Sequence, residues 1–469
     1  MTGRTALLID FGSTYTKLRA IDLDDVRILG SGQGPSTVRS DVTIGMRAAL
    51  ADLEANLGRL PQFRYRLASS SAAGGLRMVT IGLVRELTAE AARQAALGAG
   101  AKLVGAFSNK LTRGDLDAIE SLAPDIILLA GGTDGGNTEV VLHNAKALAE
   151  RKLSVPIVYA GNRVAADEAR EALAHMPLTL AANVMPEIGV LSTDSARDAI
   201  REIFIKRIVH AKGIDRAQTM FDDVLMPTPA AVMEGARLLA DGDGKRPGLG
   251  ELLVVDPGGA TTDVHSIARG DPAEGALQKG LPEPRVKRTV EGDLGMRHSA
   301  ASVVEAAGAD RIAAAAHMPA ADVGAMLAHI AQNIEGIPQT PAQRAFDRAL
   351  LLAAIEIAVK RHAGTIETVY TAIGPVQVQH GKDLTGIKTV VATGGAPIHL
   401  GEREALLAAA RADSKDPRSL RPREPQLYLD RDYLLFAVGL LAAVEPQAAL
   451  ALALRSITPA DRVPQVEAS

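Results

Sequence analysis

Hydrophobic and polar residues follow two periods along the chain, and each period predicts a type of element. Residues 5–11 form an apolar run, and residues 16–23 alternate between apolar and polar side chains, as strands do. The glycine-containing turn between these runs predicts a β-hairpin. Residues 42–60 carry apolar side chains at helical spacing, which predicts a helix, and a strand pattern returns at 65–69.

Short apolar runs alternate with helical patterns from about residue 85 onward. Strands are predicted at 102–106, 125–129, 155–159 and 178–182, and helices at 87–97, 115–122, 140–150 and 165–173. Regular alternation of buried strands and helices is typical of parallel βαβ units. We therefore expect a compact α/β module in this part of the chain.

The second half of the chain repeats the hairpin pattern. Apolar residues 252–255 and 262–267 flank a turn that begins at Asp256, and the Gly/Asp-rich residues 241–248 before them are typical of a linker. Elsewhere we predict helices at 195–209 and 229–239, turns at 268–300, Ala-rich helices at 301–362, a strand at 389–393, a loop at 411–427 and a helix at 432–444. The predicted fold class is α/β.

Composition and charge narrow the function classes. The 469 residues suggest three domains or two large lobes, at roughly 150 residues per domain. Hydrophobic residues make up 47% and charged residues 23%, which excludes a disordered chain, and the net charge of −4 argues against a dedicated nucleic-acid binder. The absence of Cys excludes disulfides, cysteine-ligated zinc, iron–sulfur clusters and thiol nucleophiles.

The apolar runs in the sequence predict neither a signal peptide nor a membrane-spanning helix. The run at residues 6–9 is too short for a signal peptide, and the run at 434–454 is interrupted by Glu445, Pro446 and Gln447. We therefore predict a cytoplasmic protein.

Two similar turns carry the candidate chemistry. Residues 10–17 (DFGSTYTK) and 256–263 (DPGGATTD) each follow a buried strand, begin with Asp and turn on Gly. Gly lets backbone N–H groups approach a phosphate chain closely, and the hydroxyl side chains that follow add donors. Lys17 can place a charge on a phosphate, and an Asp at each strand end suits the waters of hydrated Mg²⁺. Either turn alone is equally well explained as an ordinary hairpin turn, but the pair favours nucleotide binding and phosphoryl transfer.

At this point the chain resembles the actin-like ATPase superfamily of sugar kinases, actin and DnaK-class chaperones. Five signatures of that superfamily occur in order: phosphate 1 at 10–17, a first connecting helix at 227–235, phosphate 2 at 256–263, adenosine at 391–397 and a second connecting helix from 432 to 442. Ala260 stands where the chaperones usually carry a third Gly. The ordered set spans nearly the whole chain.

The resemblance implies two ribonuclease H-like lobes with ATP and Mg²⁺ in the cleft between them. Asp10 and Asp256 would then organise Mg²⁺ and its waters. The phosphates would be held by Gly12, Ser13, Thr14 and Lys17 of one lobe and by Gly258, Gly259, Ala260 and Thr261 of the other, with Gly394 and Gly395 against the adenosine. For the catalytic base, Asp263 and Glu234 are both candidates.

A rival Gly-rich loop follows the predicted strand at 125–129. Residues 131–137 (GGTDGGN) precede a helix and could bind a phosphate at its N-terminus. The loop lacks the GxGxxG order of dinucleotide folds and precedes phosphate 2, so it is not the usual adenosine loop. The alternative is a structural loop at the carboxyl edge of the module, where ligands and partners often bind.

Several further stretches are similar to one family, the glutamate mutase accessory protein L or MutL type, which is unrelated to mismatch repair. They are residues 68–79, 129–137, 159–163, 183–189, 224–229 and 289–296. This resemblance implies an ATP-driven reactivating chaperone of an adenosylcobalamin-dependent mutase. Since no DxHxxG motif is visible, cobalamin is assigned to the partner mutase and not to this chain. The partners expected are mutase subunits, without nucleic acid or membrane, and a homodimer is compatible with the pattern.

Other functions on the same fold compete with this reading. They are a small-molecule kinase, for which no distinctive substrate motif is visible, a filament protein and a non-hydrolysing ATP-dependent interaction protein. The expected organisation is lobe I at 1–84, the inserted module at 85–185, helices at 186–245, lobe II at 246–428 and C-terminal helices at 429–469.

Overall fold

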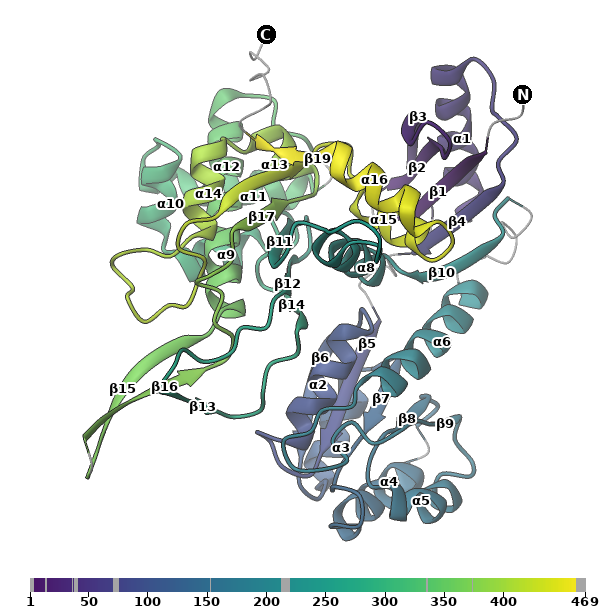
Figure 1. The fold of residues 1–469 in the computed structure, drawn as a ribbon, viewed down its shortest axis with the longest axis vertical. Coiled ribbons are helices and arrows are strands. Elements are labelled where there is room, and N and C mark those ends of the chain that lie inside the picture. Colours follow the sequence, from purple (N-terminus) through teal and green to yellow (C-terminus); the bar gives the residue numbers. More distant parts are fainter. Residues whose placement is uncertain are drawn as a thin grey trace. The chain divides into compact units, whose positions relative to one another are not determined.

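The computed structural model of the protein describes most of the chain. The described residues are 4–12, 15–35, 37, 41–70, 76–151, 153–211, 220–334, 336–372 and 374–460. The chain forms two units (Figure 1), one made of residues 1–231 and 280–284 and the other of residues 232–279 and 285–469. The first is called unit 1 and the second unit 2.

Unit 1 begins with a five-stranded sheet in the order β10-β4-β1-β2-β3, called the first sheet. Its strands are β1 (Thr5–Phe11), β2 (Tyr15–Asp22), β3 (Arg27–Pro35), β4 (Tyr65–Ser70) and β10 (Asp223–Pro227). β1 and β2 form the predicted antiparallel hairpin, and β4 runs parallel to both β1 and β10. Every residue of β1 is buried, as its apolar sequence predicts.

Helix α1 (Val42–Leu57) covers β3 of this sheet because two glycines make room for it. A Cβ on Gly32 would lie 2.3 Å from the carbonyl oxygen of Ala49, and a Cβ on Gly34 would lie 2.4 Å from that of Gly45. Larger residues on β3 would therefore push the helix away. The sequence analysis predicted α1 but did not identify β3, whose Gly-rich sequence carries little strand signal.

The second sheet of unit 1 is entirely parallel and is called the module sheet. Its order is β6-β5-β7-β8-β9, made of β5 (Arg77–Gly82), β6 (Lys102–Ser108), β7 (Ile126–Leu129), β8 (Ile157–Tyr159) and β9 (Leu178–Leu180). The predicted parallel βαβ pattern is thus present. β5 was not among the predicted strands, yet it lies between β6 and β7, where the strand order changes direction.

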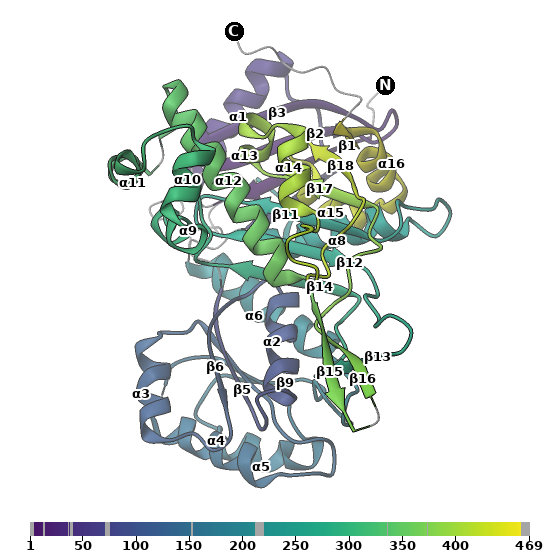
Figure 2. The ribbon, with the colours of Figure 1, turned by 90° about the vertical axis from the view of Figure 1, so that its left-hand side faces the viewer.

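Helices cover both faces of the module sheet (Figure 2). They are α2 (Thr88–Gly98), α3 (Arg113–Ser121), α4 (Glu139–Arg151), α5 (Ala166–Ala172) and α6 (Asp194–Ala211). Alanines of α2 and α6 pack with Met78 and Leu128, whereas α3, α4 and α5 pack with Ile127 and Leu129 on the other face. Small alanines let helices approach the sheet closely in a chain with few aromatic residues.

Unit 2 is built on a six-stranded sheet in the order β14-β12-β11-β17-β18-β19, called the third sheet. Its strands are β11 (Leu252–Pro257), β12 (Thr262–Ile267), β14 (Val286–Glu291), β17 (Thr389–Ala392), β18 (Gln426–Asp430) and β19 (Ile457–Pro459). β11 and β12 form the second predicted hairpin, and β17 runs parallel to β11. β14 lies where turns were predicted, and the first two residues of β18 lie in the predicted loop at 411–427.

The long helix α12 (Pro341–His362) packs on this sheet with its buried side chains against Leu253, Val255 and Val264. A capping box between Thr340 and Gln343 starts it. The other helices of unit 2 are α9 (Ala300–Ala307), α10 (Ala309–Ala315), α11 (Val323–Gln332), α13 (Gly395–Leu400), α14 (Arg403–Ala410), α15 (Leu435–Ala442) and α16 (Pro446–Ser456). Helix α8 (Thr228–Asp241) belongs to unit 1 up to Ala231 and to unit 2 from Val232 onward.

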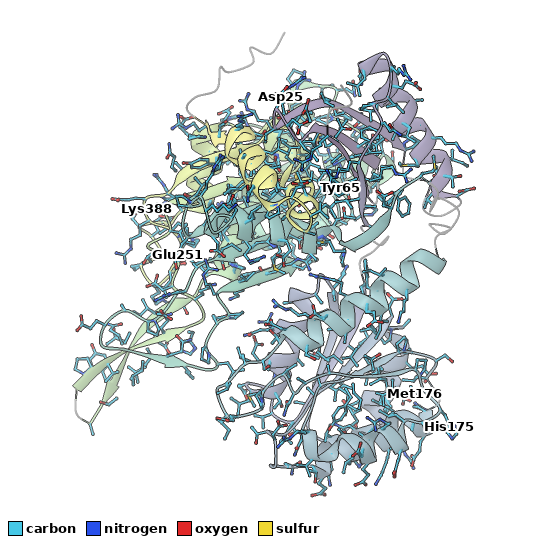
Figure 3. All side chains as sticks on the ribbon, turned by 45° about the vertical axis from the view of Figure 1, so that its right-hand side comes forward. Asp25, Tyr65, His175, Met176, Glu251 and Lys388 are labelled. Carbon is cyan, nitrogen blue, oxygen red and sulfur yellow. The ribbon has the colours of Figure 1, made fainter. Side chains whose placement is uncertain are left out.

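Three further strands of unit 2 form a separate small sheet, β13-β16-β15. They are β13 (Ala276–Lys279), β15 (Thr365–Thr371) and β16 (Gly374–His380), and none was predicted. Nearly all side chains of β15 are exposed, and they project from the hairpin into solvent (Figure 3). Because no helix covers these strands, they lack the apolar alternation by which strands are recognised.

Both units are therefore α/β, which confirms the predicted fold class. Within the part of the chain that the structure describes, every helix is too short or too polar to span a bilayer. The five domain ranges expected from the sequence remain a prediction.

Candidate functional site

The turn at the end of β1 is closed by a backbone hydrogen bond. Gly12 donates its N–H to the carbonyl oxygen of Tyr15 over 3.0 Å, and a Cβ on Gly12 would lie 2.5 Å from that oxygen. The hairpin register places Lys17 opposite Asp10. Ser13 and Thr14, which were expected to contact phosphate, lie outside the described residues. The turn therefore requires Gly at position 12 and carries Asp10 and Lys17 at its base.

Asp10 is buried, with 2% of its surface exposed. Its Oδ1 accepts hydrogen bonds from Thr228 Oγ1 at 2.6 Å and from Ser69 Oγ at 3.2 Å. Burial raises the pKa of Asp10, while the charge of Lys17 and the two hydroxyl donors act in the opposite direction. The roles of Ser69 and Thr228 were not recognised from the sequence, although Thr228 lies in the predicted first connecting helix.

The turn at the end of β11 has the same construction. Gly258 donates its N–H to the carbonyl oxygen of Thr261 over 2.8 Å, and the strands pair with Asp256 opposite Asp263. Between these ends Gly259 and Ala260 are exposed to solvent. Both predicted phosphate turns thus begin two residues after an Asp and close across four residues.

The segment after β14 supports this second turn from behind. The N–H groups of Arg297 and His298 both donate to the carbonyl oxygen of Gly259, at 2.8 and 2.9 Å. A Cβ on Gly295 would lie 2.3 Å from the carbonyl carbon of Ala260. The sequence analysis had singled out residues 289–296 but had not predicted that this segment supports the turn.

Arg297 also connects the second turn to α12. Its guanidinium forms a bidentate ion pair with the carboxylate of Asp347, which is almost fully buried. A buried, bidentate Arg–carboxylate pair has a well-defined geometry. The pair therefore ties the backbone near Gly259 to the second turn of α12.

Asp256 lies directly beside the predicted adenosine segment. β11 and β17 are adjacent and parallel, so their carboxyl ends meet at one edge of the third sheet. Gly394 has a φ of +94°, and a Cβ at this position would lie 2.7 Å from Asp256 Oδ1. Gly395 is exposed and begins α13. Phosphate 2 and adenosine segments, separated widely in sequence, are thus neighbours in unit 2.

A hollow of about 260 Å³ lies between the ends of α12 and α13. It is lined by Pro341, Arg344, Ala345, Arg348, His399 and Leu400. Arg348 forms an ion pair with Glu402. Planar guanidinium groups such as those of Arg344 and Arg348 can stack on an aromatic ring.

Each candidate catalytic base accepts a hydrogen bond from an arginine. Asp263 accepts a hydrogen bond from Arg288 at 3.2 Å, and burial raises the pKa of this carboxyl while Arg288 lowers it. Glu234 accepts from Arg237 at 3.0 Å. Both assignments as a base remain predictions.

The rival Gly-rich loop is held in one conformation by two buried asparagines. Asn162 accepts from the N–H of Gly135 and donates to the carbonyl oxygens of Gly136 and Asn137. Asn183 donates to the Gly132 carbonyl oxygen at 3.0 Å and to Asp134 at 2.9 Å. These bonds give the loop a structural explanation, because the asparagines satisfy its backbone groups internally.

The residues expected to bind the nucleotide fall into two groups by their position in the structure. Asp10, Gly12 and Lys17 lie together in unit 1, and Asp256, Gly258, Gly259, Ala260, Thr261, Gly394 and Gly395 lie together at one sheet edge of unit 2. Among the described residues, no three His, Asp or Glu side chains gather into a ready-made metal cage. Asp10 lies beside Gly12, where a Cβ would be 2.5 Å from the Tyr15 carbonyl oxygen, and Asp256 lies against Gly394, where a Cβ would be 2.7 Å from Oδ1. A carboxylate in either setting suits an ion held mainly through water and ligand oxygens.

Comparison with known proteins finds similarity over nearly the whole chain. The family model described as MutL protein matches residues 6–457. "Protein MutL" of Clostridium tetanomorphum is 47% identical over 448 residues, which is 95% of this chain and 97% of that protein.

Similarity to solved structures is much weaker. Nucleotide-free acetone carboxylase aligns over 94% of this chain and 70% of its own, with 15% identity and a TM-score of 0.44. Xylulose kinase of Bifidobacterium adolescentis aligns over 98% and 95%, with 12% identity and a TM-score of 0.32. The ethanolamine utilization protein EutJ of Carboxydothermus hydrogenoformans aligns over 96% and 90%, with 11% identity and a TM-score of 0.31.

Proposed function

Because this chain belongs to the MutL protein family, we propose that it is a cytoplasmic, Mg²⁺-dependent ATPase that serves an adenosylcobalamin-dependent mutase of the glutamate mutase or aminomutase type as a reactivating chaperone. The proposal that the protein binds ATP rests on the shared construction of the two turns. Each has a buried or half-buried Asp, then a Gly whose N–H closes the turn onto the carbonyl oxygen of the residue three positions later.

In this proposal both turns bind the phosphates of ATP. The ligands would be the backbone N–H groups of Gly259, Ala260 and Thr261, the hydroxyl of Thr261 and the positive charge of Lys17, together with Ser13 and Thr14. Gly12 and Gly258 use their own N–H groups to close the turns and let the backbone approach the phosphates without a side chain in the way. Turns of this kind form concavities lined by N–H groups, to which phosphate oxygens bind. The exposed Gly259 and Ala260 leave the backbone of the second turn accessible to such a ligand.

Asp10 and Asp256 would hold Mg²⁺ through its bound waters. When bound, the ion supplies charge neutralisation for the phosphates. The carboxylates themselves must be fixed in direction. Oδ1 of Asp10 is fixed by two hydroxyl donors, and Asp256 is confined by the close approach of Gly394.

The adenosine end of ATP would lie along Gly394 and Gly395. The hollow at Arg344, Arg348 and His399 is adjacent to α13, the helix that Gly395 begins. Arginine side chains there can cover the faces of the base. The nucleotide's two ends would thus be recognised by different chemistry, with N–H groups and charge at the phosphates and flat side chains at the base.

The reactivating role rests on differential binding. A mutase whose cofactor has lost its adenosyl group stays blocked while damaged cobalamin remains bound. An ATPase can promote release only if it binds the mutase with different affinity in its ATP and ADP states. In this proposal cobalamin stays on the mutase, and the module at residues 85–185 contacts the mutase.

ATP hydrolysis by purified wild type, Asp10→Ala and Asp256→Ala proteins tests the nucleotide site. We expect both variants to lose at least about tenfold in rate, because each removes one carboxylate from the Mg²⁺ site. Asp271→Ala, which removes an exposed carboxylate of unit 2, serves as the matched control and should keep wild-type activity. Wild-type hydrolysis by both site variants would refute the assignment.

A second experiment tests the partner. Purified protein with ATP and Mg²⁺ is added to its inactivated mutase in the presence of free adenosylcobalamin. We expect turnover to return with ATP and not with a non-hydrolysable analogue. If turnover fails to return while cobalamin exchange itself is competent, the chaperone assignment is wrong, and a purely ATP-dependent binding protein or a small-molecule kinase remains.

A further inference from the structure

Three carboxyl ends of neighbouring strands meet at Asp10. β1 pairs with β4 so that Asp10 lies opposite Ser69, and β4 pairs with β10 so that Met226 also lies opposite Ser69. Thr228 follows β10 directly and is the first residue of α8. Because parallel strands end at the same edge of a sheet, this topology brings Asp10, Ser69 and Thr228 together from distant parts of the chain.

The three side chains form a dry hydrogen-bonded cluster. Asp10 is 2% exposed, Ser69 0% and Thr228 5%. Thr228 Oγ1 is 2.6 Å from Asp10 Oδ1, Ser69 Oγ is 3.2 Å from the same oxygen, and the two hydroxyl oxygens are 3.3 Å apart. Hydrogen bonds to a charged acceptor are strong where water is excluded.

Thr228 makes the shorter of the two contacts. A hydroxyl has one hydrogen to donate. Each hydroxyl has a second acceptor within reach, since Ser69 Oγ is also 3.4 Å from the carbonyl oxygen of Ile9 and Thr228 Oγ1 is 3.3 Å from Ser69 Oγ. The 2.6 Å distance from Thr228 Oγ1 to the carboxylate is the shortest of these, which makes Thr228 the principal donor to Asp10.

The backbone that carries Thr228 is itself held by close packing. Gly100 has a φ of +88°, and a Cβ there would lie 3.1 Å from Pro227 Cβ and 3.6 Å from the nitrogen of Ala230. Residues on both sides of Thr228 are thus packed against Gly100. The hydroxyl therefore has a fixed position from which to orient the carboxylate.

The second oxygen of Asp10 lies on the side of the phosphate-1 turn. A Cβ on Gly12 would be 3.7 Å from Oδ2. The carboxylate thus uses Oδ1 for the protein and directs Oδ2 toward the turn. Rotation of the carboxyl group about its bond to Cβ would exchange these roles, and the Thr228 hydrogen bond opposes that rotation.

We propose that Thr228 is a positioning residue for Asp10, whose hydroxyl holds Oδ1 so that Oδ2 faces the Gly12 turn. This inference rests on the proposed Mg²⁺–ATP site, and it assigns to the start of α8 a role in that site's geometry. Loss of the hydroxyl should impair the step that depends on the direction of Asp10. It should change the binding of the nucleotide much less, because the base and most phosphate contacts come from other residues.

The test compares Thr228→Val, which keeps the shape and removes the donor, with Thr228→Ser, which keeps the donor. For Thr228→Val we expect kcat for ATP hydrolysis to fall about 10- to 100-fold, as small misplacements of a reacting group do, with KM for ATP changed less than about threefold. The Mg²⁺ concentration for half-maximal rate should rise. Thr228→Ser should stay within about threefold of wild type in all three quantities.

The outcomes separate this inference from the proposed function. If wild type neither binds nor hydrolyses ATP, both fail. If wild type hydrolyses ATP and Thr228→Val matches it in kcat and Mg²⁺ dependence, the positioning role alone fails. Equal loss in the Val and Ser variants also overturns it, since that pattern reports packing. Thermal unfolding is measured on each variant, and Thr228→Ala replaces the Val variant if the latter is unfolded at the assay temperature.

Discussion

Gly394 lies against the carboxylate of Asp256, so closely that a Cβ at position 394 would be 2.7 Å from Oδ1. The two residues end adjacent parallel strands, β17 and β11, of the third sheet. This contact joins the predicted phosphate-2 and adenosine segments within unit 2. It also means that residue 394 determines how much room Asp256 has.

Gly394→Ala should damage the nucleotide site. The new Cβ would collide with Asp256 Oδ1, and a φ of +94° is strained for alanine. We expect ATP affinity to fall at least about tenfold and the free energy of unfolding to fall by about 1–3 kcal/mol. Calorimetric ATP titration and urea unfolding measure both.

The control for that variant is Gly324→Ala, in an exposed position of α11 where nothing lies within 4 Å. It should leave ATP affinity unchanged and stabilise the protein by about 0.5–1 kcal/mol, because alanine is the better helix former. Unchanged ATP affinity in Gly394→Ala would show that Asp256 can move freely.

Gly295→Ala should displace the phosphate-2 turn, although residue 295 is not itself a proposed phosphate ligand. A Cβ at 295 would lie 2.3 Å from the carbonyl carbon of Ala260, and this neighbour is backbone that cannot rotate away. We expect ATP affinity to drop several-fold. Gly386→Ala, an exposed position with nothing within 4 Å, is the matched control in unit 2 and should bind ATP as wild type does. Equal affinity in both variants would contradict the support role of residues 295–298.

Asn162→Ala should loosen the Gly-rich loop at residues 131–137. Asn162 is fully buried and bonds to Gly135, Gly136, Asn137 and Val164. Removing its amide leaves these backbone groups to water, at a cost of about 2 kcal/mol in the stability of the loop. Hydrogen exchange of residues 131–137 measures the change.

Asn137→Ala is the control for the loop, because Asn137 is exposed and its side-chain oxygen accepts a hydrogen bond from the Val140 N–H in the first turn of α4. This variant should lower the stability of the loop by less, about 0.5–1 kcal/mol. If exchange in the loop is as fast in the control as in Asn162→Ala, the loop is not held by the buried asparagine.

His265 should make the stability of unit 2 depend on pH. Burial, helped by Arg288, lowers the pKa of His265 from 6.5 to about 3. Below pH 6.5 the unfolded chain binds a proton that the folded chain does not, so stability is lost as the pH falls from 6.5 toward 3. The loss amounts to roughly 2 kcal/mol at pH 5.

Urea unfolding at pH 7.5 and pH 5.0 measures this loss. His265→Asn should remove that part of the pH dependence, whereas His298→Asn, at an exposed position, should retain it. The same slope in His265→Asn and wild type would mean that another group is responsible.

The predicted elements were right where a local pattern is complete. β1 and β12 begin and end at the predicted residues, because a buried strand next to a Gly turn leaves a clear apolar run. The elements that were missed have weak local patterns. β3 is rich in Gly, and β15 is exposed along nearly its whole length. β5 is an exception, because it was missed although it is a mostly buried interior strand between β6 and β7.

The sequence by itself determined two features of the site. The two Asp–Gly turns could be predicted because a hairpin depends on residues that lie near each other in the chain. The turn at Gly394 could be predicted because it follows an apolar strand pattern. Only the tertiary structure decided which side chains contact the Asp residues of these turns. Ser69 and Thr228 reach Asp10 because parallel strands, joined by long crossovers, end at one sheet edge. Such pairings are set by the packing of the whole sheet, and no local period of hydrophobic residues reports them.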